Sequence, residues 1–149
     1  MNNIRQATPA DVARVAEIEI FNYRLNFYPI FLCDEFYFQD KQVPKEMRRY
    51  ETEKGLLENT FVYDDGVVKG FIQVDGTKVA KLFMEPVLQG QGIGAKLLEF
   101  AIKEKNVTHL WALEKNVRAI RFYERHGFHV TEEKEPEEGT TEYLVRLER

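Results

Sequence analysis

The stretch VLQGQGIGAKLLEF, residues Val87 to Phe100, places three glycines within five residues and then enters an apolar segment. Ile93, Leu97 and Ala101 recur at helical spacing, so we expect a helix over residues 93–105 that begins in the glycines. The unpaired amides and positive dipole end of such a helix favour a bound phosphate. Glycine suits this place because the absent Cβ permits positive φ and lets a pyrophosphate approach the main chain. The stretch therefore predicts a phosphate-binding loop.

A dinucleotide site is one interpretation of these glycines. Residues 90–95 satisfy G-x-G-x-x-[G/A], and Glu114 follows Gly94 at the twenty-residue distance typical of that motif. However, the loop of residues 87–89 separates the expected strand from the first glycine. The rest of the chain holds only one more strand–helix unit, too little to complete a doubly wound sheet. A P-loop is excluded because no Gly-Lys-[Ser/Thr] ends the run.

Composition limits the classes of protein that remain. The chain has 149 residues, 44% of them hydrophobic, which predicts one domain over residues 1–149 with one well-buried core. A net charge of −4 gives no general attraction to nucleic acid or anionic membrane, and it favours cationic substrates. No leader-like segment or long apolar run is visible, and Cys33 is the only cysteine, so we expect a cytoplasmic protein without disulfides.

The hydrophobic pattern predicts an α+β domain. Helices are expected from Thr8 to about Tyr23, from Pro44 to Gly55, over residues 93–105 and over residues 116–127. The expected strands with bounds cover residues 60–64, 67–75, 78–85, 109–114, 128–133 and 141–148. The order βααβββαβαββ indicates a mixed, mostly antiparallel seven-stranded sheet with four helices. An aromatic-rich stretch, residues 21–38, connects the first two helices.

Two blocks of this sequence resemble the GNAT superfamily of acetyl-CoA-dependent N-acetyltransferases. The segment LFMEPVLQGQGIGAKLL resembles its acyl-CoA-binding motif [Arg/Gln]-x-x-Gly-x-[Gly/Ala], which maps onto Gln89, Gly92 and Gly94. The segment ALEKNVRAIRFYERHGF resembles the later motif Asn-x-x-Ala-x-x-Phe-Tyr-x-x-x-Gly-Phe. It maps onto Asn116, Ala119, Phe122, Tyr123, Gly127 and Phe128. The motifs cover roughly residues 81–130, whereas residues 1–58 match only in the order of their elements.

The resemblance implies a fold and a set of cofactor contacts. It implies a GNAT-like fold in which a bulge splays the strand of residues 79–84 away from the strand of residues 109–113, leaving a slot for the pantetheine arm of acetyl-CoA. The amide of Met84 is the implied donor to the thioester oxygen. The implied cofactor-binding residues are Leu82, Phe83, Met84, Gln89, Gly90, Gln91, Gly92, Ile93, Gly94, Ala95, Asn116, Ala119 and Phe122.

The resemblance also implies direct attack of a primary amine on the thioester in a ternary complex. A lysine-like amine has a pKa near 10.4, so presenting it neutral at pH 7.4 costs about 4 kcal/mol, and a base must take its proton. Tyr123 is the expected general acid, with a half-buried core tyrosine as the alternative. Glu85, at the end of the cofactor strand, is the first candidate for the base, and a solvated carboxylate is the alternative.

The acceptor is less defined than the cofactor. Among the aromatics of residues 21–38, Tyr28 and Tyr37 are the candidates for shaping an acceptor pocket. Polyamines, amino acids, antibiotic amino groups, protein N-termini and lysines all remain open. The three histidines form no spaced pair, so no metal is expected. A non-catalytic sensor or interaction module that binds CoA or acyl-CoA is the alternative function. Exposed strands at the end of such a sheet can pair between subunits, which is compatible with a homodimer.

Overall fold

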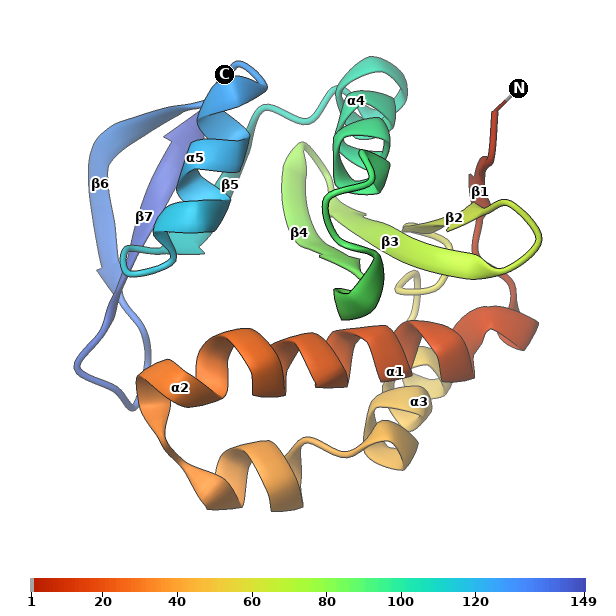
Figure 1. Cartoon of the computed structure of the whole chain (residues 1–149), viewed down its shortest axis with the longest axis horizontal. Coiled ribbons are helices and arrows are strands. Elements are labelled where there is room, and N and C mark those ends of the chain that lie inside the picture. The colour runs from red at the N-terminus through yellow and green to blue at the C-terminus, as the bar shows by residue number, and fades with distance from the viewer. Residues whose placement is uncertain (1) are drawn as a thin grey trace.

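The computed structural model describes residues 2–149, a seven-stranded sheet with helices on both faces (Figure 1). The strands are β1 (Ile4–Gln6), β2 (Thr60–Asp64), β3 (Val68–Asp75), β4 (Lys78–Met84), β5 (His109–Leu113), β6 (His129–Pro136) and β7 (Tyr143–Glu148). The α-helices are α1 (Val12–Asn22), α2 (Tyr28–Phe31), α3 (Val43–Thr52), α4 (Ile93–Lys105) and α5 (Val117–Arg125). This arrangement confirms the expected α+β class and mixed sheet.

The strands lie in the order β1-β2-β3-β4-β5-β7-β6. Every neighbouring pair is antiparallel except β4 and β5, which run parallel. The alternating turns of the β2–β4 meander explain the antiparallel half, and α4 is the crossover that a parallel pair requires. The one parallel contact therefore lies at the middle of the sheet, between the strands that flank the glycine-rich stretch and its helix.

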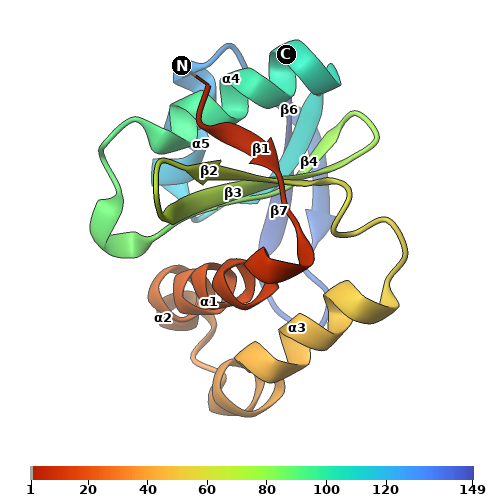
Figure 2. The ribbon, with the colours of Figure 1, turned by 90° about the vertical axis from the view of Figure 1, so that its right-hand side faces the viewer.

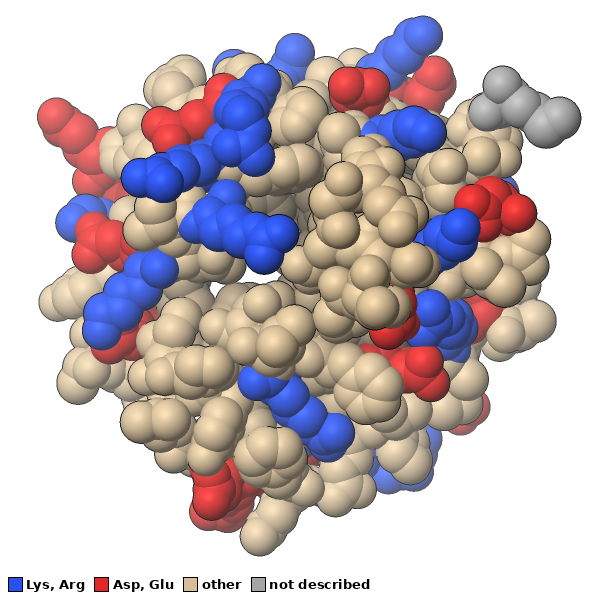
Figure 3. Space-filling model, in the orientation of Figure 1, with Lys and Arg blue, Asp and Glu red and all other residues tan. Residues whose placement is uncertain are grey.

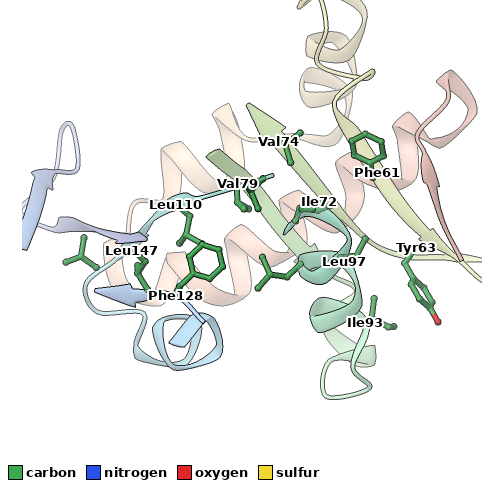
Figure 4. Packing of buried hydrophobic residues seen from close by; sticks show 14 residues of the cluster. Phe61, Tyr63, Ile72, Val74, Val79, Ile93, Leu97, Leu110, Phe128 and Leu147 are labelled. Atoms are coloured by element: carbon green, nitrogen blue, oxygen red, sulfur yellow. The ribbon is translucent and has the colours of Figure 1, made fainter. Parts of the chain in front are cut away.

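The helices form two layers (Figure 2). α4 and α5 cover one face, where Ile93, Leu97 and Phe128 belong to a core that also includes Leu110 and Leu147 from the far half of the sheet (Figure 4). α1 and α3 cover the other face, over a second core that is made of Ala7, Val12, Val15, Ile18, Tyr50, Val62 and Phe71. The sheet thus separates the two cores, and its central strands contact both helical layers.

Five α-helices occur in residues 2–149, so the expected number of four was wrong. The extra helix is α2, inside the aromatic stretch that the sequence analysis treated as a connection. Residues 23–27 continue α1 as a π-helical segment into α2. Pro29 lies in the first turn of α2, where a missing N–H is tolerated, and Leu32 ends α2 with a φ of +53°.

Most expected bounds are confirmed to within two or three residues. α4 and the strand over residues 60–64 have the expected bounds, and Pro44 lies in the first turn of α3. β6 extends three residues beyond its expected end, to Pro136, where it still pairs with Tyr143. Within residues 2–149, no helix is both long enough and apolar enough to cross a bilayer.

Candidate active site

The two central strands separate immediately after they meet. β4 pairs with β5 only at Lys78 with His109 and at Val79 with Leu110. On its other side, β4 pairs with β3 through a register shift that leaves Ala80 without its own partner, because Val79 faces Val74 and Lys81 faces Gln73. Such an extra residue bends a strand. This bulge is the one expected from the family resemblance, and we call the opening between β4 and β5 beyond Val79 the slot.

The main chain of β4 presents polar groups to the slot. Glu85 donates its amide to the carbonyl of Lys69 on β3 at 2.9 Å. Since hydrogen-bonded and non-hydrogen-bonded pairs alternate along an antiparallel ladder, the amides of Met84 and Leu82 point away from β3. Both therefore face the side from which β5 has diverged.

A cavity of about 800 Å³ continues the slot into the helical layer. Figure 3 shows the hollow at the centre of this face, with Lys and Arg side chains on its margins. The cavity is lined by Tyr23, Phe27, Ile30, Phe31, Cys33, Phe36, Tyr37, Lys41, residues 79–83, residues 110–113, Asn116, Ala119, Tyr123, residues 137–142 and Leu144. Its walls thus come from β4, β5, α5, the aromatic segment and the β6–β7 turn, which places five separate parts of the chain around one space.

The glycine-rich loop leads into α4 with its amides free. Gly90 and Gly92 have φ values of +86° and +80°, and a Cβ on either would meet no atom within 4 Å. The main-chain amides of Gln91 to Gly94 bond to no other protein group among residues 2–149. Together with the dipole of the thirteen-residue helix, these amides suit a diphosphate.

Gly94 has a different role from the other two glycines. Its φ is ordinary, but an added Cβ would lie 2.8 Å from Cε of Met84 and 3.5 Å from Cζ of Phe122. Gly94 therefore allows α4 to approach the end of β4 and α5. Met84 and Phe122, both expected to bind the cofactor, contact this glycine, and neither side chain lines the cavity.

Asn22, which the sequence analysis did not identify, connects α1 to the end of β4. Its side chain is 1% exposed and donates to the carbonyl of Met84 at 2.7 Å and to that of Ile18 at 2.8 Å. The Nε2 of Gln89 lies 3.4 Å from Asn22 Oδ1. Asn22 thus holds β4 and the start of the glycine-rich loop in one arrangement. An asparagine inside a helical pattern gives no local signal of such a contact.

Tyr123 lies on α5 in the cavity wall. Its ring packs edge-on against Phe122 and Phe128, and its hydroxyl makes no hydrogen bond with the described residues. Burial raises the pKa of the phenol well above its usual value near 10, so the group remains protonated at neutral pH. Tyr123 thus lines the cavity as a protonated phenol, which is the state that a proton donor needs.

Asn116 begins α5 as its cap. The side-chain Oδ1 accepts from the amide of Ala119 at 3.3 Å, as expected for an N-cap. Asn116 and Ala119 both line the cavity together with Tyr123, so the second motif presents one face of α5 to the slot. Leu82 and Phe83 line the cavity from β4.

Of the expected catalytic and acceptor-binding residues Glu85, Tyr37 and Tyr28, only Tyr37 lines the cavity. Glu85 pairs with Arg14 at 2.7 Å and does not line the cavity. Tyr37 lines the cavity, and burial raises its pKa to about 12. Tyr28 does not line it, because its hydroxyl donates to Asp34 at 2.6 Å while its ring lies edge-on against Tyr37.

A buried charged cluster borders the cavity and was also missed from the sequence. Lys81, a lining residue of β4, places Nζ 2.5 Å from Oε1 of Glu19 and 3.6 Å from Oε1 of Glu46. Glu19 lies on α1 and Glu46 on α3, at exposures of 0% and 3%. The sequence alone does not show whether these two helix positions face the core or the solvent. Only the tertiary structure brings the three side chains together. Among residues 2–149, no group of three His, Cys, Asp or Glu side chains could hold a metal ion.

Known proteins share both the sequence motif and the fold. Residues 57–130 match the family model described as an acetyltransferase (GNAT) domain. The peptidyl-lysine N-acetyltransferase YjaB of Salmonella typhimurium is 36% identical over 70 residues, which are 47% of this chain and 48% of that protein. The chain thus aligns with about half the length of the curated relatives that it matches.

Solved structures extend the likeness over nearly the whole chain. An N-acetyltransferase from Staphylococcus aureus Mu50 has a TM-score of 0.75 at 15% identity, covering 97% of this chain and 98% of that one. YncA of Salmonella typhimurium, solved with its cofactor acetyl-CoA, has a TM-score of 0.65 at 24% identity, covering 97% and 90%. At these identities the likeness shows the fold. With the family match through the glycine-rich loop and α5, and with the parted central strands, this chain belongs to the GNAT superfamily of acetyltransferases.

Proposed function

We propose that residues 1–149 act as a single N-acetyltransferase domain, which transfers the acetyl group of acetyl-CoA directly to a primary amine in a ternary complex. The observation that carries this proposal is the parting of β4 and β5 beyond Val79, beside a cavity that Tyr123 borders, and the unpaired amides of Gln91 to Gly94 at the start of α4 support it. Peptidyl-lysine, the acceptor in the name of the relative YjaB, is the first acceptor class to test.

The chain's own groups divide the work of the reaction. The amides of Gln91 to Gly94 hold the diphosphate, and the Met84 amide donates to the thioester oxygen as charge develops there. Holding the acceptor amine and the thioester side by side removes much of the entropic barrier to their reaction. Tyr123, which stays protonated at neutral pH, donates its proton to the sulfur as the thioester C–S bond breaks, so that CoA leaves as a thiol.

The test is an amine screen with release of free thiol as the readout. The panel contains a lysine peptide, a peptide with a free N-terminus and a blocked lysine, spermidine, benzylamine and an aminoglycoside. Acetyl-CoA binding is measured first by calorimetry. We expect transfer to at least one amine, and Tyr123→Phe should lower kcat by about 10²- to 10⁴-fold while acetyl-CoA affinity stays within twofold.

Two results would contradict the proposal, one for the function and one for the role of Tyr123. A protein that binds acetyl-CoA and acetylates no amine is a CoA-binding module, the alternative function. The matched control removes the same hydroxyl from an exposed tyrosine on β7, as Tyr143→Phe, and should leave the rate unchanged. Equal losses in Tyr123→Phe and Tyr143→Phe contradict the role given to Tyr123.

A further inference from the structure

Part of the cavity wall is aromatic and belongs to neither hydrophobic core. The aromatic residues of the described chain, residues 2–149, that line the cavity and lie outside both cores are Tyr23, Phe27, Phe31, Phe36, Tyr37 and Trp111. We call these six residues the aromatic wall. Phe31 stacks on Tyr37 with 6.4 Å between ring centroids, and Phe36 meets the same ring edge-on at 4.8 Å. Aromatic side chains that border a space without joining a core are typical of a ligand-binding surface.

The aromatic wall lies on the opposite face of the sheet from the glycine-rich loop. Side chains alternate between the two faces of a strand. On β4, Leu82 packs against the core under α4 and α5, whereas Phe83 packs against the core under α1 and α3. Tyr23 lies edge-on against Phe83 at 5.6 Å, so the wall continues the second face. If a diphosphate binds at the loop, the pantetheine arm enters the slot from the α4 face, and the aromatic wall borders the side left to the acceptor.

Unpaired carboxylates border the same cavity. Glu137 and Glu138 line it from the turn between β6 and β7, and neither has an ion-pair partner within residues 2–149 (Figure 1). Glu142 lines it as well, but Lys115 pairs with its carboxylate at 2.9 Å. Burial, and then the charge of Glu137, raises the pKa of the Tyr37 phenol to about 12, so this carboxylate lies near the aromatic wall. Carboxylates and ring faces both attract an ammonium group.

The cations that line the cavity already have partners. The Nζ of Lys41 lies 5.3 Å from the ring centroid of Tyr23 and 3.9 Å from a carboxylate oxygen of Glu46. The Nζ of Lys81 is buried beside Glu19. The cavity therefore offers unpaired negative charge to a ligand, and an acceptor with a carboxylate of its own, such as a free amino acid, is disfavoured.

We propose that the acceptor is a small primary amine that carries an aromatic ring on a short alkyl chain. This inference rests on the proposed function and names its acceptor class. The ring of the acceptor packs on the aromatic wall, and Glu137 and Glu138 attract its ammonium group to the cavity. The products are the N-acetylated amine and CoA as a thiol, and one proton is released overall because the acceptor arrives as an ammonium.

Two other acceptor classes fit the wall less well. The side chain of a lysine peptide has a four-carbon stem and no ring, so it would cover only part of the six aromatic residues. A polyamine also lacks a ring, and it would bring further charged groups out of water into the apolar part of the cavity.

The first experiment compares amines that differ only in the ring. The values of kcat/KM are measured by thiol release for 2-phenylethylamine against ethylamine and for 3-phenylpropylamine against propylamine, with a lysine peptide and spermidine as further acceptors. At least one phenylalkylamine should exceed its ring-free partner about 10- to 10²-fold, because only the ring adds apolar surface to be buried. The same amine should also exceed the lysine peptide and spermidine.

The second experiment removes one ring of the wall. Phe31→Ala should lower kcat/KM for the preferred phenylalkylamine about tenfold and leave the ring-free partner and the acetyl-CoA affinity within about twofold. The control is Phe21→Ala, which removes a 42% exposed ring of the same aromatic stretch that does not line the cavity. This control should leave both amines unchanged. Phe36→Ala, at a position that is 40% exposed, provides the test if Phe31→Ala does not fold.

The third experiment removes charge at the cavity. Glu137→Gln combined with Glu138→Gln should lower kcat/KM for the phenylalkylamine several-fold at low salt, and the loss should shrink at high salt. The control combines Glu132→Gln with Glu135→Gln, which removes the same charge from β6 outside the cavity and should change the value less than twofold.

Three results would overturn the inference and leave the proposed function standing. The first is a kcat/KM that does not depend on the ring, and the second is a lysine peptide or spermidine that exceeds every phenylalkylamine. The third is a Phe31→Ala variant that slows all amines by one common factor, which is a structural defect only. A protein that binds acetyl-CoA but acetylates no amine removes the proposed function and this inference together.

Discussion

At the scale of single residues, the glycine-rich loop combines two different uses of glycine. Gly92 is required for its backbone conformation, since its φ of +80° disfavours a side chain even though the surrounding space is open. Gly94 is required for close packing against Met84 and Phe122. The two uses respond differently to substitution by alanine.

Gly92→Ala should cost more than Gly94→Ala. Left-handed backbone costs an alanine about 1–2 kcal/mol, and relief of that strain would turn the loop amides away from the diphosphate. The alanine at position 94 meets the flexible end of Met84, which can move, so we expect a loss below about 1 kcal/mol. Urea unfolding and acetyl-CoA calorimetry on both variants measure the order, and a larger effect at Gly94 would contradict it.

Tyr123 should keep its proton over the whole working range of pH. Because burial raises the pKa of the phenol, kcat at saturating substrates should not fall as pH rises to 10, where an ordinary tyrosine is half ionised. Ultraviolet titration of tyrosinate in wild type and Tyr123→Phe gives the matching control. A difference between the two titrations below pH 10 would mean that Tyr123 ionises normally. If Tyr123 is nevertheless the general acid, kcat should then fall as pH rises toward 10.

At the scale of elements, α1 is fixed at both ends by buried polar side chains. At its start, Asp11 accepts from Arg5 at 2.7 and 3.0 Å and from the amide of Thr8 at 2.8 Å. Arg5 also donates to Asp64, so this contact joins β1, β2 and the helix. At its end, Asn22 bonds to β4. α1 therefore links the edge strands β1 and β2 to the end of β4, beside the slot.

Asp11→Asn should weaken the fold near neutral pH and matter little in strong acid. Hydrogen bonds from Arg5 and Thr8 lower the pKa of Asp11 from 3.8 to about 2. Because the folded-state pKa lies below the unfolded one, the contribution is complete above pH 4 and is lost as pH falls toward 2. We expect a loss of about 1–2 kcal/mol at pH 7 in urea unfolding.

The acid-stability comparison has its control on the same sheet. Asp75, whose side chain is 77% exposed and 3.7 Å from Lys78, should lose less than about 0.5 kcal/mol as Asp75→Asn. If Asp11→Asn stays equally destabilised at pH 2.5 and pH 7, the ionised carboxylate is not what holds the start of α1.

Asn22→Ala should reduce both stability and cofactor affinity. The Met84 carbonyl loses its donor at the point where β4 leaves β5, which costs about 1–3 kcal/mol. The loop loses the contact of Gln89 as well, so we expect weaker acetyl-CoA binding in calorimetry. Asn26→Ala is the matched control, because Asn26 bonds only to Asn22 at 3.2 Å and lies at the surface. Equal losses in both variants would remove the special role of Asn22.

At the scale of the whole molecule, the sheet consists of two halves that meet over a short distance. β1 to β4 form one half and β5 to β7 the other, and two residue pairs join them along the backbone. The core around Leu110, Leu147 and Phe128 supplies the rest of the contact (Figure 4). The slot therefore lies at the strand boundary where the sheet has the fewest paired residues.

The sequence predicted this architecture because its signals are local. Glycines before an apolar helix, alternating strands with Asp-Gly turns and Asn116 as a helix cap each act over a few residues, and each was confirmed. Contacts between distant segments carry no such signal. The pairing of Glu19 with Lys81 spans 62 positions, and that of Arg14 with Glu85 spans 71, so neither was foreseen. The helix in the aromatic segment was missed because its turns depend on packing rather than on a regular hydrophobic period.

Acetyl-CoA should stabilise the molecule by bridging its two halves. A ligand at one hundred times its Kd adds about 2.7 kcal/mol to the free energy of unfolding, which raises the Tm by several degrees. Hydrogen exchange should slow in β5 as well as in β4 and the start of α4, because the proposed position of the ligand lies between these elements. Pantetheine, which lacks the diphosphate, should give a smaller shift at the same concentration, since it cannot reach the amides of Gln91 to Gly94. Protection confined to α4, with β5 unchanged, would mean that the ligand binds the loop without entering the slot.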